Sequence, residues 1–178
     1  NTEIVYFDYS KPSLAFKKLL LSQWDGEDYP AFLDWAVNKY KIDETGGNET
    51  QRLTRQQLWE REINWWGSEK AIKEHWSRYK KLKHSYIHCD ICENPEKVTS
   101  RITNETNSVI WWSNAFHTVN AQYLRGLSGV KECYEKWCFQ IDEKNPDIWI
   151  LGKDYLDRPV EGTDIKDYLY AYNSENNT

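Results

Sequence analysis

Four short, largely apolar runs at residues 4–7, 86–91, 109–112 and 148–151 constrain the fold of this chain more than any other feature. They read IVYF, YIHCDI, VIWW and IWIL, and each intervening segment is long enough to hold a helix. Continuous apolar runs are typical of strands buried on both faces of a parallel sheet. Strands that alternate with helices indicate βαβ units. We therefore expect an α/β fold with a mostly parallel sheet.

The segment between the first two predicted strands, at about residues 30–83, carries helix signals only. Pro30 is placed to begin a helix, and Thr54 with Gln57 forms a capping-box pattern before a second helix. Ser68 is placed to cap a third helix. We expect a single α/β domain over residues 1–178, with a helical insertion at about 30–83 and a polar tail at about 152–178.

Composition excludes several classes of protein. A net charge of −5 argues against a generally basic nucleic-acid binder, although residues 70–84 form a local basic segment. This segment is either a solvated helix face or a contact surface for a nucleic-acid substrate. No run approaches the ~18 apolar residues of a membrane span. The many Asn, Lys, Ile and Tyr residues suggest an AT-rich, viral genome. We expect a cytoplasmic protein, in the host cell if it is viral, with no membrane partner.

Aromatic residues and cysteines each allow more than one interpretation. The ten Trp and twelve Tyr residues belong either to a Trp-rich core or to an aromatic platform for a ligand. Cys89 and Cys92 have the short spacing of a zinc ligand pair, but Cys133 and Cys138 lie roughly 140° apart on a predicted helix. The cysteines thus allow a zinc site, a disulfide or reduced structural thiols, and we expect four reduced thiols and no metal site.

Polar residues follow three of the predicted strands. Asp8 ends the first strand and is followed by a helix start at Ser10, while Asp90 lies near the end of the second. An acid at the carboxyl end of a parallel strand can accept hydrogen bonds from ribose hydroxyls. Asn114 and His117 follow the third strand. His117 is either a general base or a solvent-facing or helix-capping side chain. For Asp8 and Asp90 the alternative is an exposed acid at a strand end, and for Asn114 it is a cap or turn role.

The ordered set IVYFDYSKPSLAFKK, IHCDIC, VIWWSNAFHT and DIWILGKDYL resembles strands two to five of Rossmann-like S-adenosylmethionine-dependent methyltransferases. The resemblance covers about half of the chain. It implies a Rossmann-like sheet, with the helical region inserted between the first two strands of this chain. It also implies methyl transfer to an acceptor that the sequence does not name.

The resemblance assigns roles to individual residues. Asp8 would bind the cofactor ribose, and Asp90 with the backbone of Ile91 would read the adenine. Ser113 would line the cofactor site near the reaction end, and Asn114 and His117 would be the catalytic candidates.

The chain departs from the family pattern in two places. It has no G-x-G motif and no strand that matches the family's central first strand. The chain segment between Asp8 and Asp90 is also far longer than the single crossover that joins these two strands in the family. We expect S-adenosylmethionine to bind only with residues that precede Asn1, so an upstream part of the same protein is a candidate partner. The alternative is a non-catalytic α/β interaction module or viral structural module.

Overall fold

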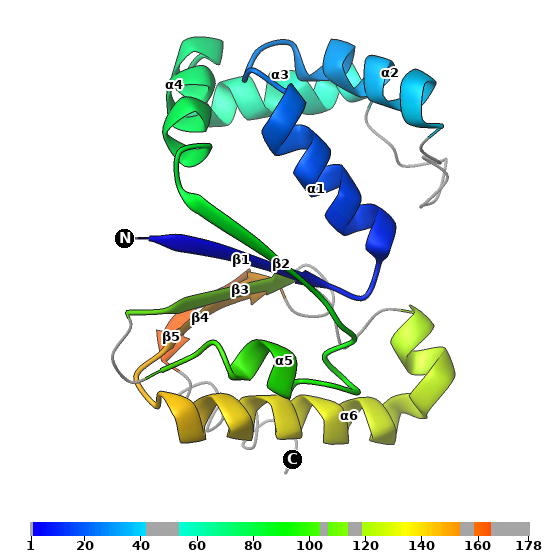
Figure 1. Ribbon diagram of the computed structural model, residues 1–178, viewed down its shortest axis with the longest axis vertical. Helices are drawn as coiled ribbons and strands as arrows, with labels where there is room; N and C mark the ends of the chain where they lie inside the picture. The colour runs from blue at the N-terminus through cyan, green and yellow to red at the C-terminus, as the bar shows by residue number, and fades with distance from the viewer. Residues whose placement is uncertain (1, 42–53, 104–106, 114–118, 154–158, 165–178) are drawn as a thin grey trace. The chain divides into compact units, whose positions relative to one another are not determined.

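The computed structural model describes residues 2–41, 54–103, 107–113, 119–153 and 159–164 (Figure 1). For residues 112–113, 119–122, 127, 151–153 and 159–164 it describes the backbone only. The described helices and strands are, in chain order, β1 (Glu3–Asp8), α1 (Lys11–Gln23), α2 (Tyr29–Tyr40), α3 (Arg55–Trp66), α4 (Glu69–Tyr79), β2 (Lys83–His88), α5 (Glu96–Thr99), β3 (Val109–Ser113), α6 (Val119–Lys144), β4 (Trp149–Lys153) and β5 (Pro159–Asp164). The protein is therefore a mixed α/β protein, as the sequence predicts.

The described strands form two sheets. β1 and β2 are neighbours and run in the same direction in the first sheet (Figure 1). In the second sheet β3 pairs with β4 in parallel, with Val109 opposite Trp149, and β5 pairs with β4 antiparallel. The sequence predicts one sheet from the first four strands, and the described residues do not show that single sheet.

The chain divides into two compact units, which share β1 and β2. The helical unit contains residues 1–6 and 12–85, and the second unit contains residues 7–11 and 86–178. The helical unit therefore includes the region predicted as an insertion, together with most of α1.

The helices of the helical unit begin at local sequence signals. Thr54 accepts a hydrogen bond from the backbone N–H of Gln57, whose side chain in turn accepts one from the N–H of Thr54. This reciprocal pair is the predicted capping box of α3. The Ser68 side chain caps α4 as predicted, and Asp28 caps α2 directly before Tyr29 and Pro30.

The core of the helical unit is built on three tryptophans. Trp24, Trp59 and Trp76 are each less than one-tenth exposed, and the Trp24 ring centroid lies 4.9 Å from that of Trp76 and 6.1 Å from that of Trp59. Each indole also donates a hydrogen bond, for example from Trp76 Nε1 to the Trp24 carbonyl at 3.0 Å. Aromatic pairs of this kind add about 0.5–1.5 kcal/mol beyond the burial of their area. This part of the predicted Trp-rich core is confirmed.

A second core lies in the other unit. It contains Cys89, Ile91, Cys92, Val98, Ile102, Ile110, Val130, Tyr134, Trp137, Cys138, Ile141, Ile148 and Ile150. Phe7 at the end of β1 and Ile87 in β2 pack against it. The core joins one face of the β3–β4 pair to α6, so the apolar runs that predict strands also supply its side chains.

The described part of α6 changes direction at Gly126, which has φ 67° and ψ 174°. A residue with φ in this range is strained unless it is glycine. Gly126 and Gly129 predict an interruption of the helical stretch at about residues 119–144, and the kink confirms it. Among the described helices, none combines the length and the apolar content that crossing a lipid bilayer requires.

Candidate site at the carboxyl ends of the first sheet

Asp8 ends β1 and organises the turn into α1. Its Oδ1 atom accepts a hydrogen bond from the backbone N–H of Ser10 at 2.8 Å. Such a bond, from an Asp side chain to the backbone two residues later, forms an Asx turn. The side chain is half-buried, so it is held in place while part of it still meets solvent.

Asp90 repeats this arrangement after β2. Its Oδ1 atom accepts a hydrogen bond from the backbone N–H of Cys92 at 2.8 Å. The backbone N–H of Cys89 donates to the Asp8 carbonyl at 3.1 Å, so the two strand ends are directly adjacent. The two acids that the sequence singles out therefore lie at one edge of the first sheet.

Arg125 in α6 contacts the same edge, although no sequence pattern points to it. Its Nη2 atom lies 3.0 Å from Asp90 Oδ2 and 3.0 Å from Glu93 Oε1. Burial works against the charged guanidinium, but the negative charges led by Asp90 outweigh this effect and raise the Arg125 pKa above its ordinary value. Arg125 is therefore a permanent cation, fixed next to Asp90.

The structure does not bring the side chains of the other predicted site residues together with Asp8 and Asp90. The Ile91 side chain is buried in the second core, so only its backbone is available for the predicted contact with adenine. Ser113 ends β3, and it pairs with Lys153 of β4 through the backbone. Ser113 therefore belongs to the second sheet. Asn114 and His117 lie outside the described residues.

All four cysteines carry free thiols. Burial, helped by the charges of Cys133 and Asp90, raises the Cys92 pKa to about 12. Burial also raises the pKa of Cys89. Within the described ranges, no three His, Cys, Asp or Glu residues are grouped so that they could hold a metal ion.

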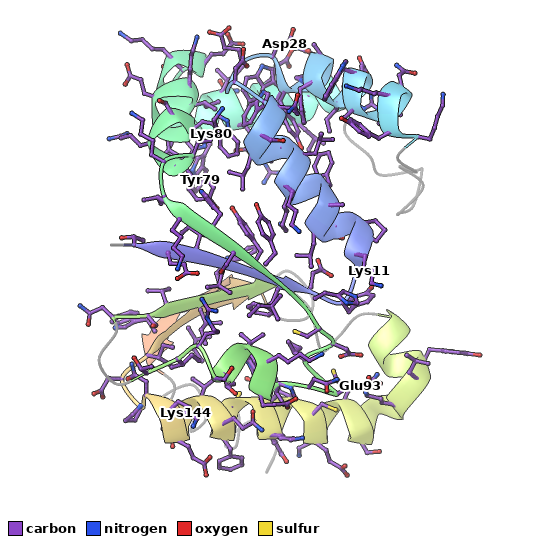
Figure 2. The ribbon with its side chains drawn as sticks, in the orientation of Figure 1. Lys11, Asp28, Tyr79, Lys80, Glu93 and Lys144 are labelled. Atoms are coloured by element: carbon purple, nitrogen blue, oxygen red, sulfur yellow. The ribbon has the colours of Figure 1, made fainter. Side chains whose placement is uncertain are left out.

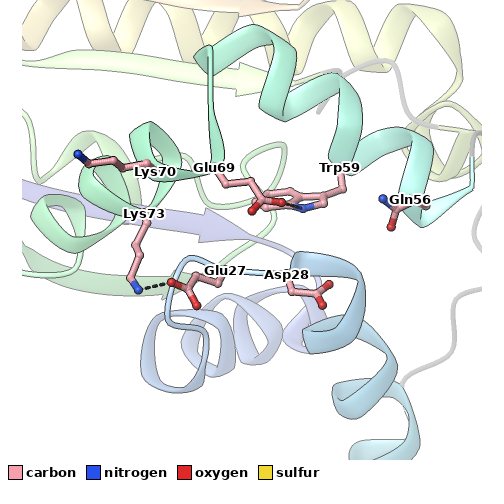
Figure 3. Close-up of a pocket in the computed structure, with 7 residues that line it drawn as sticks. All are labelled: Glu27, Asp28, Gln56, Trp59, Glu69, Lys70 and Lys73. Atoms are coloured by element: carbon pink, nitrogen blue, oxygen red, sulfur yellow. Dashed lines mark hydrogen bonds and ion pairs between the residues drawn. The ribbon is translucent and has the colours of Figure 1, made fainter.

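The helical unit has a separate hollow of about 690 Å³ (Figure 3). It is lined by Glu27, Asp28, Gln56, Trp59, Glu69, Lys70 and Lys73. Lys73 forms an ion pair with Glu27, and Trp59 Nε1 donates to Glu69 at 3.2 Å. Since Asp28 caps α2, most of the charged groups already have partners within the protein, and this hollow is a weaker candidate than the strand-end acids.

The basic segment at residues 70–84 is also largely engaged with the protein itself. Lys80 Nζ donates to the Trp24 carbonyl at 3.0 Å, and Lys83 pairs with Glu3 at 3.0 Å (Lys80 is labelled in Figure 2). Lys73 is paired with Glu27. These cations stabilise the helical unit, and contact with a nucleic acid stays a prediction.

Comparisons of this chain with known protein families, with curated proteins and with solved structures find no match. The fold and the site thus define only a class, an α/β protein with acids at adjacent strand ends.

Proposed function

We propose that this chain is a nucleoside-binding α/β domain of the S-adenosylmethionine-dependent methyltransferase type. The observation that carries the proposal is the hydrogen bond from the Cys89 N–H to the Asp8 carbonyl, which brings Asp8 and Asp90 to one strand edge. An adenosine ligand needs two separate acceptors, one for its ribose hydroxyls and one for its adenine amino group. Adjacent strand ends supply both.

The pairing of the strands supports this proposal. In the family that the sequence resembles, this chain's β1 and β2 would be neighbours, as would β3 and β4, with the central first strand between the two pairs. The described strands have both pairs as neighbours, and β1 does not pair with β3 in the described sheets. A Rossmann-like sheet that lacks its central strand would have this connectivity.

The existing contacts of Asp90 are compatible with a ligand. An ionised carboxylate has about four sites that accept hydrogen bonds. Cys92 and Arg125 occupy two of them in the described structure. Asp90 can therefore accept a further bond from an amino group.

Little acid–base chemistry is required of the protein in the proposed reaction. The sulfonium of the methyl donor is already activated, so alignment of donor and acceptor gives most of the rate. Asn114 and His117 are proposed for the reaction end, where His117 would take a proton from an acceptor that has to lose one. The acceptor class is not defined by these residues.

The proposal is tested by NMR titration of the ¹⁵N-labelled chain with S-adenosylhomocysteine. We expect binding no tighter than roughly 1 mM, about −4 kcal/mol, because the chain has no G-x-G loop to approach the amino-acid end of the ligand. The amide shifts should centre on residues 8–10 and 90–93. Micromolar binding would show that the alignment with the family is wrong. Shifts centred elsewhere, or no shifts at about 10 mM ligand, would remove the proposed site.

A non-catalytic interaction module is the second candidate, and an exposed sheet face favours it. Trp111 and Trp149 of β3 and β4 are 65% and 54% exposed, and Val109 beside them is 60% exposed. The opposite face of these strands is buried, with Ile110 at 7% and Ile150 at 0%. Exposed apolar patches rimmed by polar residues often mark protein contacts. If Trp111→Ser leaves the oligomeric state and partner binding unchanged, this candidate loses its support.

A further inference from the structure

Two tyrosines and a histidine of the helical unit bring together polar atoms that the proposed nucleoside site does not use. Tyr6 lies in β1, Tyr79 is the last residue of α4, and His84 lies in β2 (Tyr79 is labelled in Figure 2). The hydroxyl groups of Tyr6 and Tyr79 are hydrogen-bonded to each other, and His84 Nδ1 lies 3.4 Å from Tyr6 Oη. Three separate elements therefore place two oxygens and one nitrogen side by side.

The second ring nitrogen of His84 fixes how its imidazole can act. His84 Nε2 lies 3.0 Å from the carbonyl oxygen of Tyr79. A carbonyl oxygen only accepts hydrogen bonds, so Nε2 carries a proton, and Nδ1 of the neutral ring presents a lone pair to Tyr6. Histidines that bind metals donate their other ring N–H to a carboxylate, a backbone carbonyl or water in this way. His84 is thus oriented as a metal-binding histidine is.

We infer that Tyr6, Tyr79 and His84 form a binding site for ferric iron. Phenolate oxygens are hard, anionic ligands that suit a small and highly charged cation, and imidazole also binds iron. Tyrosine is likewise the protein ligand of the iron in some haem proteins. The site uses none of the cysteines, and the inference does not depend on the proposed nucleoside function.

The arrangement requires little movement to bind an ion. Two atoms at neighbouring positions of an octahedral ion, each about 2.0–2.1 Å from it, lie roughly 2.9 Å apart. His84 Nδ1 and Tyr6 Oη, at 3.4 Å, are already close to this separation, so side-chain rotation is sufficient. All three side chains are half-buried, so the fold holds them while an ion can still reach them from solvent.

Protons and charge balance in the binding step. Each phenol loses one proton to solvent as its oxygen bonds to the ion, whereas His84 loses none, because its Nδ1 lone pair is already available. No electron is transferred, and the iron stays ferric. The Lys17 ammonium lies 5.4 Å from the centroid of the Tyr6 ring and repels the ion, but the two phenolates carry more charge of the opposite sign. The other positions of the ion are left to water or to the anion that delivers it.

The test titrates the full chain with ferric nitrilotriacetate and follows the visible absorption. A bond between phenolate and ferric iron gives a charge-transfer band in the visible range, which the iron-free chain does not have. We expect this band to saturate at one ion per chain. The affinity should rise with pH, because the phenols have to lose their protons. No visible band at saturating iron would overturn the inference.

Substitutions identify the ligands. Tyr6→Phe and Tyr79→Phe each remove one phenolate and keep the ring, so each should reduce the band and weaken iron binding by at least about tenfold. His84→Asn should also weaken binding, but it should keep most of the band, because the band arises from the phenolates. Tyr40→Phe and His88→Asn are the matched controls, since both side chains are exposed, and they should change neither the band nor the affinity.

A band that survives both tyrosine substitutions, or one that falls equally in Tyr40→Phe, would show that the iron binds elsewhere and would overturn the inference. If a variant fails to fold, NMR of the unmodified chain with gallium(III) decides the question, because this ion has the same charge as ferric iron and is diamagnetic. The ring signals of Tyr6, Tyr79 and His84 should shift on binding. Shifts confined to other residues would contradict the site.

Discussion

Asp90 and Arg125 form a largely buried ion pair, in which Oδ2 and Nη2 are 3.0 Å apart and the side chains are 29% and 14% exposed. The pair joins the loop after β2 to α6, and Glu93 adds a second carboxylate to the same guanidinium. It fixes one of the two acids on which the proposed nucleoside site depends. Asp90 therefore has a structural role in addition to any ligand role.

The Arg125→Ala variant should show how much this pair stabilises the fold. It leaves the half-buried Asp90 carboxylate without its cation, so we expect the free energy of unfolding to fall by about 1–3 kcal/mol. Urea denaturation measures the change. Lys131→Ala is the matched control on the same helix, because the Lys131–Glu135 pair is exposed and 3.9 Å long. Its cost should be below about 0.5 kcal/mol, and equal costs for the two variants would contradict this account.

Gly26 should be far less tolerant of substitution than Gly67. Both have positive φ, at 99° and 85°, but a Cβ at Gly26 would lie 3.1 Å from the Lys73 Cα and from Trp76 Cδ1. A Cβ at Gly67 would meet nothing within 4 Å. Gly67→Ala should cost about 1–2 kcal/mol for its backbone conformation alone. Gly26→Ala should cost about 1–3 kcal/mol more, because it also overpacks the Trp-rich core. Thermal melts of both variants check the order, and the reverse order would show that α4 does not approach Gly26 this closely.

Stability should decrease at alkaline pH. Burial raises the pKa of Tyr29, of Cys89 and of Cys92, the last to about 12. In the unfolded chain these groups titrate near their ordinary values of about 8.5 for Cys and about 10 for Tyr. Above about pH 8.5 the unfolded chain therefore loses protons that the folded chain retains, and stability falls as pH rises.

Urea midpoints between about pH 7.5 and about pH 10.5 measure this dependence. The Cys92→Ala variant should have a shallower slope, because one of the raised groups is gone. A midpoint that stays constant or rises over this range would mean that the thiols are not buried in the protonated form.

The local features of this fold could be predicted from the sequence because their partners are close in the chain. The Thr54–Gln57 capping box and the Ser68 cap depend on groups three residues apart, and the structure contains both. The break at Gly126 is local as well, since it depends on a single glycine. The burial of Ile110 and Ile150 follows from their place in continuous apolar runs.

The missed features depend on partners that are distant in the chain. β5 contains Pro159 and Gly162, which favour a turn, yet it pairs with β4 once the two segments meet. It lies within the region at about 152–178 that is predicted as a polar tail. Arg125 has no local signal that points to Asp90, because the contact is made only when α6 packs beside the loop after β2.

The most direct test of the proposed site compares the affinity of the chain for S-adenosylhomocysteine before and after the substitution Asp8→Asn. The asparagine keeps an oxygen that can accept from the Ser10 N–H, but it replaces a ribose acceptor with a donor. We expect binding to weaken by about 1–3 kcal/mol, as also for Asp8→Ala, because ribose hydroxyls lose their partner. Glu143→Ala, which removes an exposed acid from the same unit, should leave the affinity unchanged. Unchanged affinity in both Asp8→Asn and Asp90→Ala would contradict the nucleoside assignment and favour the interaction module.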